Sequence, residues 1–218
     1  MSTQTIGFVG GTGPEGRGLA LRFALAGRSV MIGSRQRERA VAAVEKIADR
    51  VPEGSVAGAP NDEVAAASDV VFIAVPYEGQ RPTLESIGPS LTGKLVITVV
   101  APLAFDGGAA TAVRVPEGSA ALQAAQLLPN ARVAAAFHNL SARDLLRPDE
   151  SVDSDVLVFS DDERARSEVA DLTSLIPGAR AIDGGGLVNA RYAEDLTALL
   201  LNVNRIHKAH ASIRITGL

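Results

Sequence analysis

Three glycines near the N-terminus have the spacing of a loop that binds the pyrophosphate of a dinucleotide. Gly11, Gly13 and Gly16 form a G-x-G-x-x-G motif between the short apolar run Thr5–Val9 and a predicted helix over Pro14–Ala26. Such glycines permit a tight turn, let the backbone approach the pyrophosphate and let the helix pack closely on the strand. Free backbone N–H groups and the helix dipole then favour the anion. The motif predicts dinucleotide binding, and a glycine turn without a ligand is the alternative.

The end of the second predicted strand, Ser29–Ile32, indicates which dinucleotide is bound. NAD sites usually carry Asp or Glu there, whereas this strand is followed by Ser34 and Arg35. A hydroxyl group and a guanidinium suit the extra 2′-phosphate of NADP. We therefore predict NADP, with Ser34 and Arg35 as first contacts and Arg39 as a second charge. Arg37 is predicted to lie on a solvated helix face.

Two later strands end in prolines at the edge where open α/β sheets bind ligands. The sequences there are Val75-Pro76-Tyr77-Glu78 and Ala101-Pro102-Leu103. The residues expected to contact the cofactor are Val75, Pro76, Tyr77, Ala101 and Leu103. Simple strand termination is the alternative for both prolines.

His138 is the candidate catalytic residue. It directly follows the predicted strand Arg132–Phe137, so it belongs to the same sheet edge. An imidazole there could line the substrate or donate a hydrogen bond, since its usual pKa suits several roles. A packed structural histidine is the alternative.

An alternation of strand-like and helix-like segments positions these candidates. Asp69–Val75 and Lys94–Val100 are continuous β-branched runs, typical of a parallel sheet that is covered on both faces. A further strand is expected at Asp155–Phe159. Helices are expected at Gln36–Arg50, Ser119–Leu128 and Glu163–Leu175, and a functional loop at Ala101–Ala110. The alternation predicts a Rossmann-like α/β fold with a doubly wound, mostly parallel sheet.

The last part of the chain is small. After three glycines at 184–186, the remaining residues form a predicted long helix, Asn189–His210, and a tail. We therefore divide the chain into a dinucleotide-binding domain, residues 1–138, and a small C-terminal α/β part with the long helix, residues 139–218. The basic end carries Arg205, Lys208 and Arg214, which could attract an anionic ligand. The preference of a helix end for cations is the alternative.

The composition narrows the class of protein. The net charge is −4, so general nucleic-acid binding is disfavoured. Cysteine is absent, which excludes disulfides and thiolate metal sites, and no metal site is expected. There is neither an apolar run of about 18 residues nor a signal-peptide pattern. We expect a cytoplasmic protein without a membrane partner.

No side-chain pair stands out for acid–base catalysis. Tyr77 and Tyr192 are the only tyrosines, and neither is followed by Lys four residues later. A hydride acceptor that is itself a redox ring would need little acid–base help, because the cofactor carries the chemistry.

In combination, these residues resemble the NADPH:coenzyme F420 oxidoreductase family, the F420-dependent NADP reductases. The resemblance covers nearly the whole chain. The motifs that carry it are Gly10-Gly11-Thr12-Gly13, Gly16 with Gly18-Leu19-Ala20-Leu21-Arg22, Gly33-Ser34-Arg35, Val75-Pro76-Tyr77-Glu78, Pro102-Leu103, Phe137-His138 with Ala142, Asn204-Arg205 and Lys208-Ala209-His210-Ala211. It implies a homodimer that binds NADP along the sheet edge. The deazaflavin coenzyme F420 would lie in a pocket formed partly by the C-terminal part, and hydride would pass directly between the two rings.

The resemblance also assigns roles to residues. Thr12, Ser34, Arg35 and Arg39 would hold the NADP phosphates, Pro76 and Ala101 would line the nicotinamide, and His138 and Leu140 would line the deazaflavin. The loop residues expected at the cofactor are Gly11, Thr12, Gly13, Pro14, Glu15 and Gly16. Pro14 and Glu15 stand where archaeal members have Asn-Leu. Glu15 is an unusual neighbour for a pyrophosphate, so its side chain is expected to point outward.

Other functions share this cofactor architecture. One alternative is an NADPH-dependent flavin or ferric reductase that resembles the cytoplasmic domain of metalloreductases. Imine reductases are disfavoured because the chain lacks room for their helical dimerisation domain. A non-catalytic regulator that senses NADP is the alternative from a different class. The long helix Asn189–His210 is the expected dimer interface, with internal packing as its alternative.

Overall fold

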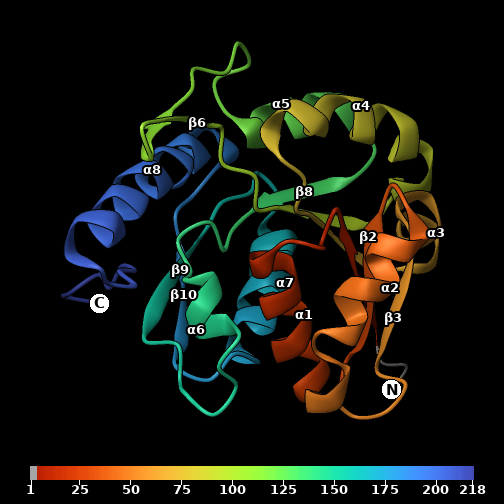
Figure 1. The fold of residues 1–218 in the computed structure, drawn as a ribbon. Coiled ribbons are helices and arrows are strands. Elements are labelled where there is room, and N and C mark those ends of the chain that lie inside the picture. The colour runs from red at the N-terminus through yellow and green to blue at the C-terminus, as the bar shows by residue number, and fades with distance from the viewer. Residues whose placement is uncertain (1–3) are drawn as a thin grey trace.

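Six parallel strands form the central sheet, in the order β3-β2-β1-β4-β5-β8 (Figure 1). A computed structural model describes residues 4–218 of the chain. The strands are β1 (Thr5–Val9), β2 (Ser29–Ser34), β3 (Val56–Pro60), β4 (Val70–Ile73), β5 (Leu95–Thr98) and β8 (Arg132–Ala135). The strand order reverses between β1 and β4, which is the place where doubly wound sheets bind ligands. The predicted Rossmann-like fold is therefore confirmed.

Helices cover both faces of this sheet (Figure 1). One face packs against α1 (Pro14–Leu25), α2 (Arg37–Glu45) and α7 (Glu163–Ser174). The other packs against α3 (Asn61–Ala67), α4 (Tyr77–Ile87) and α5 (Ala120–Leu127). Each face has its own apolar core, which explains why the central strands read as continuous apolar runs rather than alternating ones.

Four phenylalanines stack under the edge of the sheet that binds ligands in this fold. The ring centroids of Phe8 and Phe72 lie 4.7 Å apart, and those of Phe72 and Phe137 lie 5.6 Å apart. Phe23 from α1 meets Phe137 edge-on at 6.4 Å. Because Phe137 directly precedes His138, this buried cluster fixes the backbone from which the histidine projects.

The C-terminal part adds a second, smaller layer. β9 (Ser154–Val158) and β10 (Ala179–Asp183) pair with each other in parallel, separate from the central sheet. In the chain, α7 lies between these two strands, and α8 (Ala190–His207) follows them. The strand expected at Asp155–Phe159 forms, but it does not join the parallel sheet. An antiparallel bridge between Ala135 and Phe159 connects the two sheets, and the Ser160 hydroxyl donates to the carbonyl of Val133 at 2.6 Å. The strand pattern could not distinguish these two placements, because both bury the same residues.

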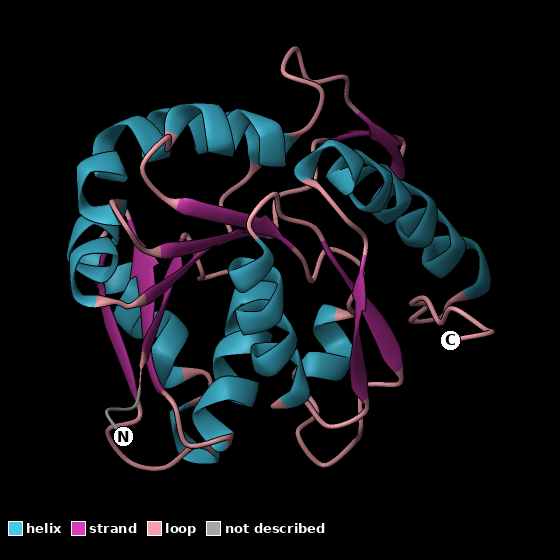
Figure 2. Ribbon diagram, turned by 180° about the vertical axis from the view of Figure 1, so that it is seen from behind, coloured by secondary structure: helices cyan, strands magenta, loops and turns pink. Residues whose placement is uncertain are grey.

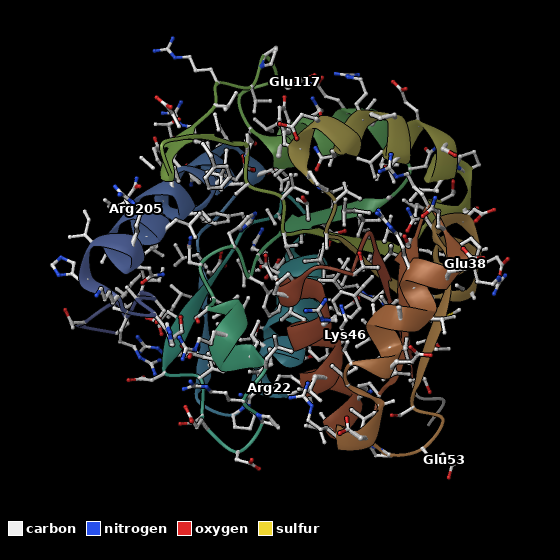
Figure 3. All side chains as sticks on the ribbon, viewed as in Figure 1. Arg22, Glu38, Lys46, Glu53, Glu117 and Arg205 are labelled. Atoms are coloured by element: carbon white, nitrogen blue, oxygen red, sulfur yellow. The ribbon has the colours of Figure 1, made fainter. Side chains whose placement is uncertain are left out.

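Arg22 ties α1 to the segment around α6 (Ala142–Leu145). Arg22, which is labelled in Figure 3, is 3% exposed, and its guanidinium donates five hydrogen bonds to backbone carbonyls. The acceptors are the carbonyls of Asp144, Leu145, Arg147, Pro148 and Glu150, at 2.6–3.2 Å. A buried charge is tolerated only when its donors are satisfied, as they are here. The clamp holds α6 beside α1 and so places the residues just before α6.

Two predicted segments differ from the structure. The helix expected over Gln36–Arg50 stops at Glu45, and a short 3-10 turn, Ala48–Arg50, follows. Ile47, at this turn, is fully buried in the core. The loop expected at Ala101–Ala110 instead contains the start of an antiparallel hairpin, β6 (Leu103–Asp106) and β7 (Ala109–Ala112).

The hairpin is held by α8, which lies beside it (Figure 2). The amide of Asn202 in α8 accepts from the N–H of Ala110 at 3.0 Å and donates to its carbonyl at 2.7 Å. This contact, 92 residues apart in sequence, has no local signature. The edge strand β3 and the helices α3 and α4 also went unpredicted, since Val56–Pro60 is made of small residues and α4 contains Pro82.

Within residues 4–218, no helix is long and apolar enough to cross a bilayer.

Candidate functional site

A cavity of about 630 Å³ opens at the carboxyl ends of the central strands. Segments that are far apart in the sequence meet there: the glycine loop, the ends of β4, β5 and β8, and the C-terminal helix and tail. The lining residues are Gly10, Thr12, Gly13, Glu15, Ala74, Val75, Pro76, Val99, Val100, Ala101, Leu103, His138, Asn139, Leu140, Ser141, Ala142, Arg143, Thr197, Leu200, Leu201, Asn204, His210 and Ala211. The volume lies in the range of small-molecule sites.

Each of the three motif positions requires glycine for a different structural reason. A Cβ on Gly11 would lie 2.4 Å from the Cβ of Phe8, and one on Gly16 would lie 2.6 Å from the carbonyl oxygen of Gly11. Gly11 and Gly16 therefore have no room for a side chain, because the turn packs against Phe8 and the helix packs against the turn. A Cβ on Gly13 would meet no protein atom within 4 Å. Gly13 leaves an exposed backbone that a ligand can approach closely, as a pyrophosphate-binding loop needs.

The glycine loop leads into a helix whose N-terminus is open. Gly13 is the N-cap of α1, so no side chain caps the first turn, and Pro14 occupies the first helical position. The uncapped N–H groups and the helix dipole remain free for an anion.

Asn61, the first residue of α3, holds this loop, a role that the sequence did not reveal. Its Oδ1 accepts a hydrogen bond from the N–H of Gly10 at 3.0 Å. It also contacts the β2 end, where a Cβ on Gly33 would come within 2.7 Å of the same oxygen. The available signal was weak: an Asn that follows Pro60 at the start of α3.

Two of the three arginines after β2 are free of acidic partners. Arg37 pairs with Glu63 at 2.5 Å, as a solvated helix face would. Arg35 and Arg39 are exposed and form no ion pair with any residue in the described range 4–218. Ser34 is buried at the end of β2, and its Oγ accepts from the N–H of Gln36 at 3.4 Å. Ser34, Arg35 and Arg39 lie outside the cavity lining, at and after the end of β2.

His138 lies in the cavity wall with its side chain unpaired. It is 5% exposed, and neither ring nitrogen has a hydrogen-bond partner among the described residues. Burial lowers the pKa of His138 to about 4, so its ring is neutral near pH 7. Unsatisfied buried nitrogens are costly and are expected where a ligand supplies the partner.

The backbone around His138 is held in an unusual conformation. Phe137 has φ of +68°, in the left-handed region that residues other than glycine seldom adopt. Asn139 anchors the turn to α8, since its Nδ2 donates to the carbonyl of Ala193 at 3.0 Å and to Thr197 Oγ1 at 3.2 Å. The hydroxyl of Thr197 lies within hydrogen-bond distance of two carbonyl acceptors, that of Ala193 at 3.0 Å and that of His138 at 3.3 Å. Sequence reasoning missed Asn139 and Thr197, because this contact is long-range.

Glu15 points into the cavity, so the expectation that it faces outward is wrong. It is the second residue of α1, and side chains there lean back toward the helix N-terminus, where the cavity opens. Its Oε1 is buried without a partner among the described residues. Burial raises the pKa of Glu15 to about 8.

The other predicted residues divide into two groups. Val75, Pro76, Ala101, Leu103 and Leu140 all line the cavity. Tyr77 begins α4 and faces α5 instead, where its hydroxyl accepts a hydrogen bond from Gln123 Nε2 at 3.4 Å.

The C-terminal tail reaches the cavity through His210 and Ala211. Beyond them it is pinned by Asp155, whose buried carboxylate binds Arg180 at 2.9 Å and Arg214 at 2.8 Å. Arg214 also pairs with Asp153, so this member of the basic tail is already neutralised. Arg205, in contrast, is exposed on α8 (Figure 3).

Replacing Asp155 by Asn should lower the Tm by about 5 °C near pH 7. The Arg180 hydrogen bonds, with those from Ile215 and Arg214, hold the pKa of Asp155 well below its usual range. A depressed folded-state pKa stabilises the fold above the unfolded value and loses that effect as the pH falls. The Tm difference should therefore shrink below about pH 4, as thermal melts would measure.

The control for this experiment is Asp171→Asn, on the exposed face of α7. It should change the Tm little at any pH. A Tm difference for Asp155→Asn that stays constant down to acid pH would contradict the role of the carboxylate charge.

Known proteins resemble this chain over nearly its whole length. The family model "NADP oxidoreductase coenzyme F420-dependent" matches residues 5–102. The F420-dependent NADP reductase of Methanothermobacter thermautotrophicus is 46% identical over 98% of this chain and 95% of its own. That of Methanocaldococcus jannaschii is 37% identical over 98% of both chains. The crystal structure of a candidate F420-dependent NADP reductase from Arthrobacter sp. FB24 has a TM-score of 0.83 at 26% identity, covering 97% of this chain and 100% of the other. This chain therefore belongs to the F420-dependent NADP reductase family.

Proposed function

We propose that this protein transfers a hydride between NADP(H) and the deazaflavin coenzyme F420. The observation that carries the proposal is the 37–46% identity to relatives named F420-dependent NADP reductase, over 98% of the chain. A cavity that joins a dinucleotide-type glycine loop to an unpaired His138 supports it.

The residues present fit NADP. The open backbone at Gly13 and the uncapped start of α1 suit a pyrophosphate, together with Thr12. Arg35 and Arg39, with the Ser34 hydroxyl, suit the 2′-phosphate. Pro76 and Ala101 would line the nicotinamide, which supplies or accepts the hydride when bound.

The deazaflavin would occupy the part of the cavity formed by residues after 137. His138 and Leu140 would line it, and α8 contributes Thr197 and Leu200 to the same wall. Under this proposal residues 1–138 bind NADP, and residues 139–218 help to bind the deazaflavin and form the dimer.

This site would catalyse hydride transfer by holding the nicotinamide and the deazaflavin in position against each other. Among the described lining residues no acid–base pair is formed, and the imidazole of His138 is neutral. Holding two reactants in register lowers a barrier by roughly 7–11 kcal/mol at best. The apolar walls, such as Val75, Val99 and Leu103, would exclude water from the hydride path.

The same proposal includes a homodimer that works in the cytoplasm. Large apolar side chains are exposed along the C-terminal helix and on the neighbouring hairpin, as a subunit interface would require. They are Phe105 on the hairpin and Tyr192, Leu199, Leu201 and Ile206 on the helix, with Val188 just before the helix. The acidic, cysteine-free composition is compatible with a reducing compartment.

The test is an anaerobic assay of the purified protein with NADPH and oxidised coenzyme F420. Bleaching of the deazaflavin absorbance is expected with NADPH and not with NADH. FMN and a ferric chelate, run in parallel, test the flavin and ferric reductase alternatives, which the relatives' names do not favour. Tight NADPH binding without turnover of any acceptor would instead indicate an NADP-sensing regulator.

A further inference from the structure

Glu15 is the only acidic side chain among the described residues that line the cavity. Its Oε1 is buried and has no hydrogen-bond partner. Burying a carboxyl group without a partner destabilises a protein by a few kcal/mol. Glu15 is half-buried, and no group within residues 4–218 hydrogen-bonds to its buried Oε1, so this oxygen is free to meet a bound molecule.

Glu15 forms no ion pair with any cationic side chain among the described residues, and burial is the cause of its raised pKa. The other titratable or charged side chains of the cavity are His138 after β8, Arg143 in α6 and His210 in the tail. The Nδ1 of His210 lies 3.1 Å from an Asp144 carboxylate oxygen. On α1 itself, Arg17 donates to the carbonyl of Thr12 at 2.6 Å.

We propose that Glu15 recognises the nicotinamide end of the dinucleotide and favours the oxidised, cationic ring over the reduced, neutral one. The inference rests on the proposed function. The pyrophosphate belongs at the glycine loop, and the nicotinamide end then extends past the β1–β4 switch point into the cavity. Glu15 shares that cavity with Pro76 and Ala101. A carboxylate attracts a cationic ring strongly in such an apolar site and gains little from a neutral one.

This arrangement makes NADP⁺ binding depend on pH. Because burial raises the pKa of Glu15 to about 8, its carboxyl is mostly protonated near pH 7 when no dinucleotide is bound. A cationic ring favours the ionised form, so NADP⁺ binding should release a proton and tighten as the pH rises. His138, with its pKa lowered to about 4, stays neutral in this range. The 2′-phosphate titrates in both ligands, so the ratio of their dissociation constants cancels its effect.

The test measures Kd for NADPH, by its fluorescence, and for NADP⁺, by competition, at about pH 6 and about pH 9, which bracket the raised pKa. In the wild type, the Kd ratio should shift toward NADP⁺ by about tenfold between these two conditions. Glu15→Gln should make the ratio nearly independent of pH, with NADP⁺ binding about tenfold weaker at the higher pH. Glu163→Gln, an exposed first-turn glutamate of α7, is the matched control and should behave as the wild type.

Several outcomes would overturn the inference. Equal tightening of both ligands in Glu15→Gln would place the carboxyl against the pyrophosphate, where its charge repels. If the ratio of the two Kd values in the wild type does not change with pH, Glu15 does not contact the cationic ring. If Glu15→Gln folds poorly, the pH dependence of the Kd ratio in Glu15→Asp and in the wild type shows whether Glu15 favours NADP⁺. Failure of the F420 assay with an intact, pH-dependent ratio would refute the proposed function and leave this inference standing.

Discussion

Replacing Arg35 by Ala should raise the KM for NADP by roughly thirtyfold, because a charge-assisted contact to the 2′-phosphate contributes about 2 kcal/mol at a partly exposed site. The KM for NAD, which lacks that phosphate, should change by less than about twofold. Arg35 follows β2 and has no acidic partner within the described residues 4–218, so its charge is available. Steady-state kinetics with both dinucleotides measure the effect.

Arg37→Ala is the matched control for this substitution. It removes an exposed arginine two positions away whose charge is already paired with Glu63. Its KM for NADP should stay within about twofold of the wild type, since exposed ion pairs contribute little. Equal losses for NADP and NAD in Arg35→Ala would refute the 2′-phosphate assignment. The double variant with Arg39→Ala should lose more NADP affinity than either single variant.

Replacing His138 by Phe should reduce kcat/KM for coenzyme F420 by about a hundredfold, with the NADPH Kd retained. The reason is that both ring nitrogens are buried and unpaired in the protein, so they are free to bind a ligand. Phenylalanine keeps an aromatic ring at this position, although a six-membered one, and loses both nitrogens. Kinetics with varied deazaflavin and NADPH fluorescence titration separate the two effects.

The stability of this variant distinguishes a functional from a structural histidine. A buried, unpaired imidazole destabilises the fold, so His138→Phe should keep or raise the Tm. His207→Phe, at the exposed end of α8, is the control and should affect neither activity nor Tm. A lower Tm in His138→Phe together with loss of both ligands would show that the ring only packs.

Much of the central fold was predictable because it depends on local patterns. The runs predicted as strands at Thr5–Val9 and Lys94–Val100 are short and rich in β-branched residues, and they form β1 and β5 (Leu95–Thr98). Helix α1 begins at a proline and ends before Gly27, whose φ is positive. The helix predicted at Asn189–His210 forms as Ala190–His207. Elements with weak sequence patterns were not predicted, since β3 is an edge strand of small residues and α4 contains a proline.

The sequence by itself was enough to predict a dinucleotide-binding glycine loop, a site for a 2′-phosphate after the second strand and the sheet edge where ligands bind. These follow from residue types at fixed short spacings, which a βα unit places in one way. The positions of Gly13, Ser34 and Arg35 needed no distant contact to be interpreted.

Only the tertiary structure decided which groups face one another in the cavity. The inward direction of Glu15, the anchoring of Asn139 on α8 and the pairing of Arg214 with Asp155 all depend on contacts between segments far apart in sequence. Burial, which raises the pKa of Glu15 and lowers that of His138, is likewise a property of the assembled walls. No periodicity or spacing encodes it, because the desolvation of a group is set by every segment that packs around it.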